Sequence, residues 1–402
     1  MNLMFRGMLS LVVAGCVAVA ADENTAANST TVKADEQAQA PATAAPAPAP
    51  APASAAAAET PQKSVNNFTW KGVKLSGILD GYYLNNSNDP ASGKNATRAF
   101  DTEANAWDLN MLKFAIEKSA EPIGFRLDLG VGRAFDVFQF YEPTRRVEQL
   151  NPVMQGYISL KPKSWNGVQI DVGKFYTWAG AELTETHLNW NYSRGLLYNN
   201  GPFYHFGVRG TKTIGKSFTA GIALVNGWNN VVDQNRGKTL GFTGIYTKGK
   251  ATWAQTYYVG PEKFKVNKGY RHFYDTALTV NTSDKNSFFV NFDYGLDRGV
   301  QMKGNKWVAL SFADRFAITK KVAAAARYEW YNDINGFITG TAQKLQSFTL
   351  TGEYKFIDGL LTRLEYRRDF SNQAFFDRRP GLANVKNQNT VLIGFVGYFG
   401  PK

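Results

Sequence analysis

The amino-acid sequence predicts an all-β protein, a transmembrane antiparallel up-and-down β-barrel of about 16 strands that follows a disordered linker. Three observations lead to this fold class. From Trp70 onward apolar side chains recur at every second residue, short and long connections alternate, and tryptophans gather near the ends of the repeated segments. The composition agrees, because only 19% of the residues are charged while 14% are aromatic and glycine occurs 37 times. Soluble proteins average roughly 25% charged residues.

The N-terminus is predicted to be a secretory signal peptide over residues 1–21. Arg6 precedes a run of apolar or small residues from Met8 to Ala20, and polar Asp22 follows. A charged start, a short apolar run and an Ala-x-Ala exit are typical of such signals. The segment 13–16, Val-Ala-Gly-Cys, also resembles a bacterial lipobox, so cleavage near Ala20 and lipidation of Cys16 both stay open. Either route takes the protein out of the cytoplasm.

Residues 22–67 are predicted to be the disordered linker. They are rich in Ala, Pro, Thr and Gln, with an alternating Ala-Pro tract over 45–53. Such a segment cannot bury enough apolar surface to offset its ordering entropy, and the Ala-Pro part favours the extended polyproline II helix. Residues 1–66 hold three of the 45 basic and five of the 33 acidic residues, so 42 basic and 28 acidic residues remain beyond them. The predicted barrel, residues 68–402, therefore carries a net charge of +14.

The strands of this barrel are predicted from alternation. Apolar residues occupy every second position of segments such as 123–132, 217–226 and 345–356, with polar or small residues between them. Successive side chains of a strand point to opposite faces of the sheet, so each segment has one apolar and one polar face. We place the strands near 73–84, 108–118, 123–132, 151–161, 168–177, 202–212, 217–226, 238–247, 250–259, 273–281, 287–296, 306–317, 321–331, 345–356, 360–370 and 389–399.

The connections decide where the apolar face points. Short turns such as 247–250 and 357–359 alternate with longer loops such as 85–107, 133–150 and 178–201. Bacterial outer-membrane barrels place short turns in the periplasm and long loops outside. The tryptophans support this interpretation, because all of them except Trp190 lie near a predicted strand end, where indole rings form the girdles of such barrels. We therefore expect the cell outer membrane as the location and its lipid as a partner.

The last predicted strand indicates a second partner, the outer-membrane assembly machinery. Val391, Ile393, Phe395 and Phe399 share one face close to the chain end. This resembles the terminal signature that delivers barrels to the outer-membrane assembly machinery, although the trailing Gly400-Pro401-Lys402 departs from a terminal aromatic residue.

A ring of about 16 strands is too wide for side chains to fill, so we expect a water-filled channel for small hydrophilic solutes. Arginine facing lipid at mid-depth would cost roughly 2–4 kcal/mol, so the charged face is expected to point inward. The predicted pore-lining residues are Arg126, Asp128, Arg327, Glu329, Arg363, Glu365 and Arg367. They form either a solvated or ion-paired wall, or a constriction that favours anionic solutes.

The loop 178–201 is the candidate for a constriction loop. It carries Glu182, Glu185 and His187, and the loop at this position of general porins folds into the lumen. The alternative is an ordinary external loop.

The sequence lacks the residue patterns that other classes of function require. One cysteine and three scattered histidines indicate no metal site, no cofactor is expected, and no residue is predicted to be catalytic. His205 is the histidine predicted on a strand, and no serine stands within two residues of it, which argues against a barrel lipase. The mean hydropathy of −0.32 argues against a helical membrane protein, and export argues against nucleic acid as a partner. A structural or adhesive barrel, tethered to the cell wall through its linker, is the alternative function, and the oligomeric state stays open, with a homo-oligomer among the choices.

A run of short motifs resembles one family. The motifs are Gly173-Lys174-Phe175, Gly180-Ala181-Glu182, Asn191-Tyr192-Ser193-Arg194, Gly201-Pro202, His205-Phe206-Gly207-Val208-Arg209, Val225-Asn226-Gly227-Trp228-Asn229, Asp233-Gln234-Asn235 and Tyr258-Val259-Gly260. In this order they resemble the putative β-barrel porin family called OmpL-like, over nearly all of 73–399. The resemblance implies an outer-membrane pore and no catalytic residues.

Overall fold

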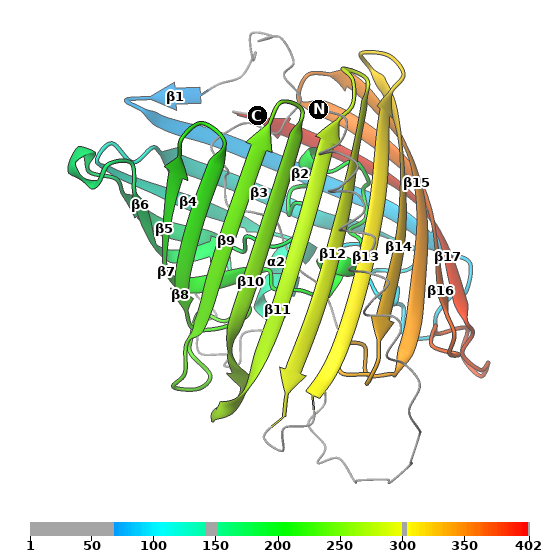
Figure 1. Cartoon of the computed structure of the whole chain (residues 1–402). Helices are drawn as coiled ribbons and strands as arrows, with labels where there is room; N and C mark the ends of the chain where they lie inside the picture. Colours follow the sequence, from blue (N-terminus) through cyan, green and yellow to red (C-terminus); the bar gives the residue numbers. More distant parts are fainter. Residues whose placement is uncertain (1–67, 141–150, 300–303, 401–402) are drawn as a thin grey trace, which may run out of the picture. The chain divides into compact units, whose positions relative to one another are not determined.

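The structure is a computed structural model that describes residues 68–140, 151–299 and 304–400, all of which belong to one compact unit. Within these residues sixteen strands, β2 to β17, close an antiparallel barrel in which each strand pairs with its sequence neighbours and β17 pairs with β2 (Figure 1). The predicted fold class is confirmed. The predicted signal peptide 1–21 and linker 22–67 lie outside the described residues.

The barrel strands agree closely with the predicted segments. They are β2 (Val73–Asn86), β3 (Ala106–Lys118), β4 (Ile123–Val131), β5 (Val153–Leu160), β6 (Gln169–Tyr176), β7 (Tyr204–Ile214), β8 (Phe218–Val225), β9 (Thr239–Lys248), β10 (Ala251–Lys263), β11 (Val266–Asn281), β12 (Asn286–Arg298), β13 (Gly304–Ala317), β14 (Val322–Asp333), β15 (Gln343–Ile357), β16 (Leu360–Ser371) and β17 (Asn387–Phe399). A short strand β1 (Phe68–Trp70) pairs with β2, and helices α2 (Arg133–Phe140), η2 (Lys163–Trp165), η3 (Thr186–Leu188) and α3 (Leu196–Asn199) lie in connections. None of the described helices is long and apolar enough to cross a membrane.

One connection differs from its prediction. Residues 260–272 were expected to form a loop, but β10 and β11 continue through them as a hairpin, in which Pro261 faces Tyr270 and Lys263 faces Val266. Polar residues interrupt the apolar alternation there, because the hairpin extends past the apolar band of the barrel. The paired arms satisfy each other's backbone groups without needing an apolar face.

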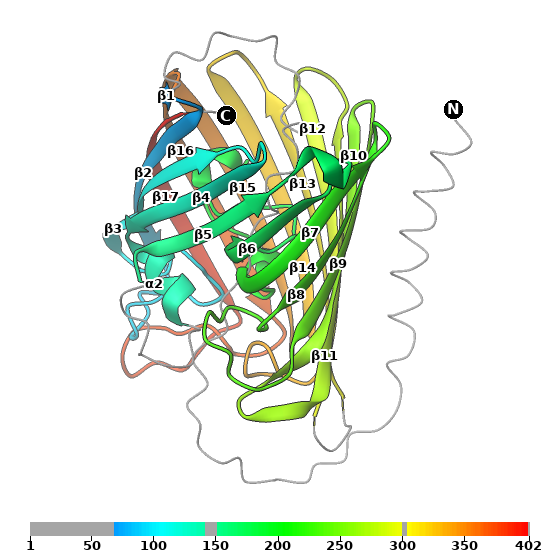
Figure 2. The same cartoon turned by 90° about the vertical axis from the view of Figure 1, so that its left-hand side faces the viewer.

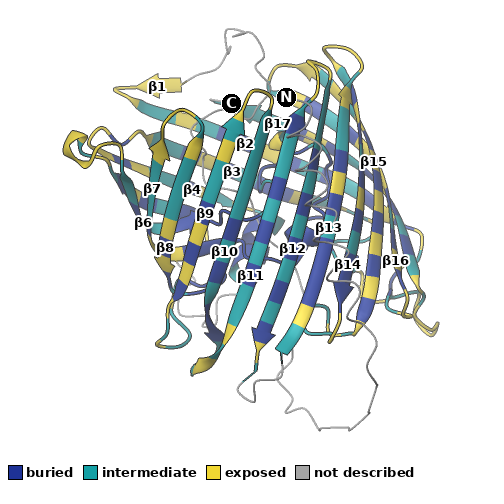
Figure 3. Ribbon diagram, in the orientation of Figure 1, coloured by how far each residue is buried: buried dark blue, intermediate teal, exposed yellow. Residues whose placement is uncertain are grey.

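The outer face of the barrel is apolar, as the alternation predicted. Large apolar side chains on the outward positions of the strands, such as Ile222, Leu350 and Leu364, are exposed. Figure 3 shows exposed positions recurring along the strands. Polar groups on this face bond to one another: the Tyr274 hydroxyl donates to Gln255 Oε1 at 2.9 Å, and Trp253 Nε1 donates to the Thr276 hydroxyl at 2.8 Å. Such pairs let polar side chains face hydrocarbon, where an unpaired group is costly.

The interior is packed rather than open at the level of the long loops. Segments of the connections after β2, β4 and β6 turn inward and join wall residues in a buried apolar cluster that includes Phe100, Phe138 and Tyr198. Helix α2 lies beside β3, β4 and β5 (Figure 2). Leu392 and Val396 of β17 belong to the same cluster, which explains why the inward face of the last strand is apolar. The side chains of the wall by themselves do not fill the ring, as expected, and side chains of the inward connections occupy part of it at this level.

Candidate pore constriction

The connection between β6 and β7, residues 177–203, forms an inner loop that touches the wall in many places. At its start it reaches β10 to β12: Trp178 N donates to the Tyr258 hydroxyl at 3.1 Å, and Gly180 N donates to Asp275 Oδ1 at 3.0 Å. Further along it reaches β14 to β17, β2 and β3. A loop bonded to strands around the ring lies across the lumen.

Three arginines of β14 and β16 hold this loop. Arg327 Nη1 donates to Glu182 Oε1 at 2.5 Å and to the Ser193 carbonyl at 2.8 Å. Arg367 Nη1 donates to the Arg194 carbonyl at 2.6 Å. Each arginine is 1% exposed, so its charge is compensated by these contacts instead of by water.

Arg363 bonds three carbonyl groups of the loop backbone. Its guanidinium donates to the carbonyls of Thr186 at 2.7 Å, Asn189 at 2.5 Å and Asn191 at 3.0 Å. It also donates to Glu353 Oε2 at 2.7 Å. Glu365, on the same strand, accepts the backbone N–H groups of Tyr192 at 2.6 Å and Ser193 at 3.1 Å, so β16 offers both donors and acceptors to the loop backbone.

The opposite side of the loop is held from β2 to β4. The Tyr192 hydroxyl donates to Asp80 Oδ1 at 2.5 Å, and the Thr186 hydroxyl bonds the other oxygen of this carboxylate. Lys113 bonds Glu185 of the loop and donates to Asp128 at 2.9 Å. The loop is thus anchored on two neighbouring sectors of the wall, β14 to β16 and β2 to β4, which are separated by β17, and its start is bonded to β10 and β11 on the facing wall.

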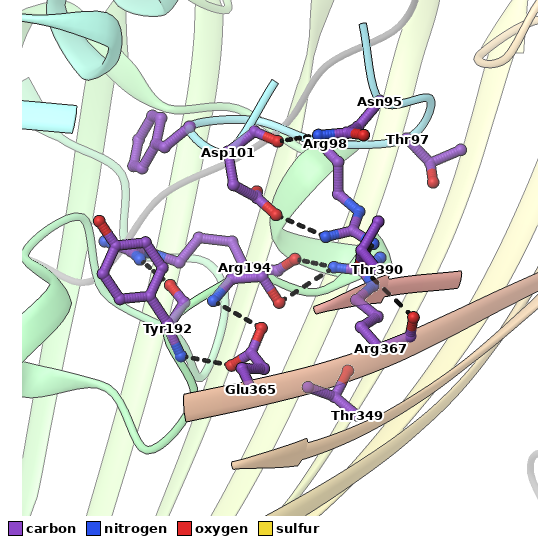
Figure 4. A network of polar contacts seen from close by, with 12 residues as sticks. Asn95, Thr97, Arg98, Asp101, Tyr192, Arg194, Thr349, Glu365, Arg367 and Thr390 are labelled. Carbon is purple, nitrogen blue, oxygen red and sulfur yellow. Dashed lines mark hydrogen bonds and ion pairs between the residues drawn. The ribbon is translucent and has the colours of Figure 1, made fainter. Parts of the chain in front are cut away.

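A second connection adds to this network. Arg98, in the connection between β2 and β3, is 1% exposed and pairs with Asp101 at 2.5 Å and with Asp369 of β16 at 2.9 Å (Figure 4). Asp369 also accepts from Arg367 Nε at 2.8 Å, and Arg367 in turn holds the inner loop. Contacts of Asp369 with Arg98 and of Arg367 with Arg194 therefore connect the β2–β3 connection and the inner loop to β16.

Two titratable groups of the inner loop are tuned by their surroundings. Burial opposes ionisation of Glu185, but the charge and the hydrogen bond of Lys113, together with the charge of Arg126, outweigh it and hold the pKa of this carboxyl below its ordinary value. Burial lowers the pKa of His187 to about 4, so its imidazole is neutral at pH 7. This ring stacks on Tyr398 of β17, with centroids 4.4 Å apart.

The wall next to the short turns is less covered, and it has two different sides. On β7 to β11 hydroxyls dominate: Thr211, Thr219, Thr247, Thr252 and Thr279 face inward at partly exposed positions. The other side carries partly exposed charges in pairs. Arg126 pairs with Glu117 at 2.8 Å, and Arg315 pairs with Glu353 at 2.9 Å. A solute entering from this end would meet hydroxyls on one side and ion pairs on the other.

A small cavity lies between the inner loop and β11 and β12. Gly180, Glu182, Asp275, Asn291 and Asp293 contribute to its lining, and it has room for about one water molecule. Among the described residues no group of histidine, cysteine or acidic side chains could hold a metal ion.

The structure places all the predicted site residues on the interior side. Asp128, Arg327, Glu329, Arg363, Glu365 and Arg367 are buried in the wall, Arg126 is partly exposed, and Glu182, Glu185 and His187 lie in the inner loop. Arg327 and Glu182 meet directly, whereas Glu185 meets Lys113 and Asp128. The buried arginines lie beneath the loop, and whether they line the conducting path stays a prediction.

Sequence reasoning missed Lys113, Asp80 and Arg98. Lys113 had a signal, because it is a lone cation between Leu112 and Phe114 on the polar side of a predicted strand. Arg98 had no signal for its contact with β16, since Asp369 is 271 residues away.

The comparison with known families decides the identity of this barrel. The family described as putative beta-barrel porin-2, OmpL-like, matches residues 72–399. The chain belongs to this family. The porin is therefore an outer-membrane channel, as the motifs of the sequence implied. No curated relative matches it.

Solved structures share the fold of this porin at low sequence identity. The anion-selective porin from Comamonas acidovorans has a TM-score of 0.56 and 13% identity, over 81% of this chain and 99% of its own. OmpT of Vibrio cholerae has a TM-score of 0.55 and 13% identity, over 83% and 99%. The outer-membrane channel DcaP of Acinetobacter baumannii has a TM-score of 0.55 and 12% identity, over 83% and 100%.

Proposed function

We propose that this porin mediates passive diffusion of small hydrophilic solutes without catalysis, that the inner loop sets its width, and that it has a modest preference for anions. The observation that supports this proposal is the anchoring of residues 177–203 by buried charges on β14 to β16 and on β2 and β3, together with the hydrogen bonds of the loop to β10 and β11 on the facing wall. A loop held in this way narrows the lumen and leaves solutes to cross it by diffusion.

Electrical recording tests the channel itself. The refolded chain in a planar phosphatidylcholine bilayer should produce current steps of one reproducible size. A protein that inserts and retains its barrel, yet never produces a step, would leave the structural or adhesive role as the better account.

The anion preference rests on the net charge of +14 beyond residue 66 and on bases that remain partly exposed inside. Arg126, Arg315 and Lys355 face the interior near the short turns, beside Glu117 and Glu353. Because Arg126 and Arg315 pair with these acids, the preference should be small. The fold neighbour from Comamonas acidovorans is anion-selective, which agrees with the proposal.

The reversal potential across a salt gradient tests this preference. Replacing Arg126, Arg315 and Lys355 by Gln should move it toward cation selectivity, while the matched variant with Glu117→Gln and Glu353→Gln should move it the other way. If neither set of substitutions changes the reversal potential, these side chains do not determine the ion selectivity of the channel.

We also propose that the porin is a homo-oligomer. OmpT of Vibrio cholerae has been solved in a form described as a trimer. Native mass spectrometry in detergent should show a multiple of the chain mass, and a monomer over the whole concentration range would exclude the oligomer.

A further inference from the structure

The outer face of the barrel carries a group of basic side chains next to the long loops. Arg298 on β12, Lys306 on β13, Lys344 on β15 and Arg368 on β16 form what we call the basic rim. Their cross-strand partners place all four on the outward face: Lys306 lies opposite Leu296, Lys344 opposite Asn332, and Arg368 opposite Phe348. Arg298, Lys306 and Lys344 are exposed, and Arg368 is partly exposed.

No acid of these strands balances the basic rim on the outside. The Asp and Glu residues in the described parts of β11 to β16 alternate onto the inward face, with Asp314 as the exception, and Asp314 lies next to a short turn at the other end. Inward neighbours of the rim, such as Asp297 and Asp369, are 0% and 1% exposed. The rim is therefore a surface of one sign that faces away from the lumen.

On the outward face, the type of side chain changes along the strands from the middle of the barrel toward the basic rim. On the outward face of β12 to β16 an apolar band with Val290, Leu310 and Leu364 gives way to Tyr and Trp rings, and the rim follows. The Tyr366 hydroxyl donates to Asn389 at 3.0 Å, and the Arg368 guanidinium lies 4.6 Å from the Phe370 ring centroid. Aromatic rings mark the border of the hydrocarbon, so charges just beyond them stand at the level of lipid headgroups.

The opposite wall has a different outer face. Near the long loops β7, β8 and β9 place Phe206, Leu224 and Leu240 outward, and all three are exposed. Basic residues near the headgroup level are thus concentrated on β12 to β16 and do not continue onto these three strands.

We propose that the basic rim binds phosphate groups of the lipid headgroups in the outer leaflet of the outer membrane. Arginine and lysine are the side chains that hold phosphate, and the strands that carry the rim place no Asp or Glu on their outward face at this end of the barrel. The inference requires the barrel to lie in the membrane but does not depend on what the channel conducts.

Lipid binding in detergent tests the proposal on the full chain. The probe is diphosphorylated lipid A, titrated against the barrel and measured by native mass spectrometry. Each base near an anionic lipid surface contributes about fivefold in affinity. Four independent contributions multiply to about 600-fold, so the variant with Arg298, Lys306, Lys344 and Arg368 all replaced by Gln should bind far more weakly, and a loss of less than about tenfold would overturn the proposal.

A matched control removes the same charge from the other end of the barrel. Replacing Lys248, Lys285, Lys320 and Lys321 at the short turns by Gln should change lipid A affinity by less than about twofold. An equal loss in both variants would show general charge attraction and overturn the proposal. Unchanged binding in the rim variant, or equal binding of lipid A without its phosphates, would also overturn it.

Free phosphate and misfolding are distinguished by two more measurements. If inorganic phosphate alone bound the wild type as tightly as lipid A, the site would serve free phosphate and not a lipid. If the four-residue variant failed to form a barrel, the pair Arg298→Gln with Lys306→Gln should still show about a 25-fold loss, and no loss would overturn the proposal. Conductance in phosphatidylcholine should match the wild type in the rim variants, so failure of the channel and failure of lipid binding are read separately.

Discussion

Replacing Arg363 by Gln tests whether buried charges hold the inner loop. In the structure this guanidinium bonds three loop carbonyls and Glu353, and its side chain is 1% exposed. Glutamine is too short to reach all of them and carries no charge, so three loop carbonyls and the Glu353 carboxylate lose this buried cation, and Glu353 keeps only Arg315 as a charged partner. Removing one member of a buried ion pair costs about 3–5 kcal/mol. We expect stability against denaturant to fall by about that amount, and the released loop to make single-channel current larger or noisier.

Arg315→Gln is the matched control for this prediction. Arg315 bonds the same Glu353 at 2.9 Å, but its side chain is 32% exposed and this partner belongs to the wall, not to the inner loop. Solvent screens this pair, so its loss should cost about 0–1 kcal/mol and leave the size of the current steps unchanged. The reasoning fails if Arg363→Gln keeps wild-type current and stability, or if the control changes the current equally.

Two further changes probe the packing and the charge of the inner loop. A Cβ added at Gly394 would lie 2.2 Å from the Tyr192 ring, whereas one at Gly352 meets nothing within 4 Å. Gly394→Ala should therefore lower the unfolding free energy by about 1–3 kcal/mol and Gly352→Ala much less; equal losses would show that the ring moves aside freely. Glu185 has a lowered pKa in the folded protein, so its contribution to stability is present at neutral pH and is lost as the pH falls from about 5 toward 3. Glu185→Gln should make the unfolding midpoint less dependent on pH in that range. If the pH dependence of the midpoint is unchanged in this variant, other titratable groups cause it.

The strands could be predicted because their signal is local. On β16, for example, Leu364 and Tyr366 alternate with Arg363, Glu365 and Arg367, and a period of two residues is sufficient to separate the two faces. The β10–β11 hairpin was missed for the same reason, since its polar arms leave the alternation although their backbones pair.

The contacts of the candidate site could be predicted only in part. The arginines were expected to face inward, because lipid excludes them, and they do. The partners of these arginines could not be predicted. Arg363 bonds backbone carbonyls 172 to 177 residues away, and every residue carries such a carbonyl, so the sequence does not distinguish the ones that bond.

The sequence by itself determined the fold class, the number of barrel strands and which side chains face lipid, since each follows from side-chain chemistry repeated along neighbouring residues. Tertiary structure alone decided that the inner loop crosses the lumen, that Glu182 meets Arg327 and Glu185 meets Lys113, and that apolar clusters fill the space between them. The physical reason is closure of the ring: only when β17 pairs with β2 do distant strands enclose one space, and only then do buried charges have neighbours that compensate them.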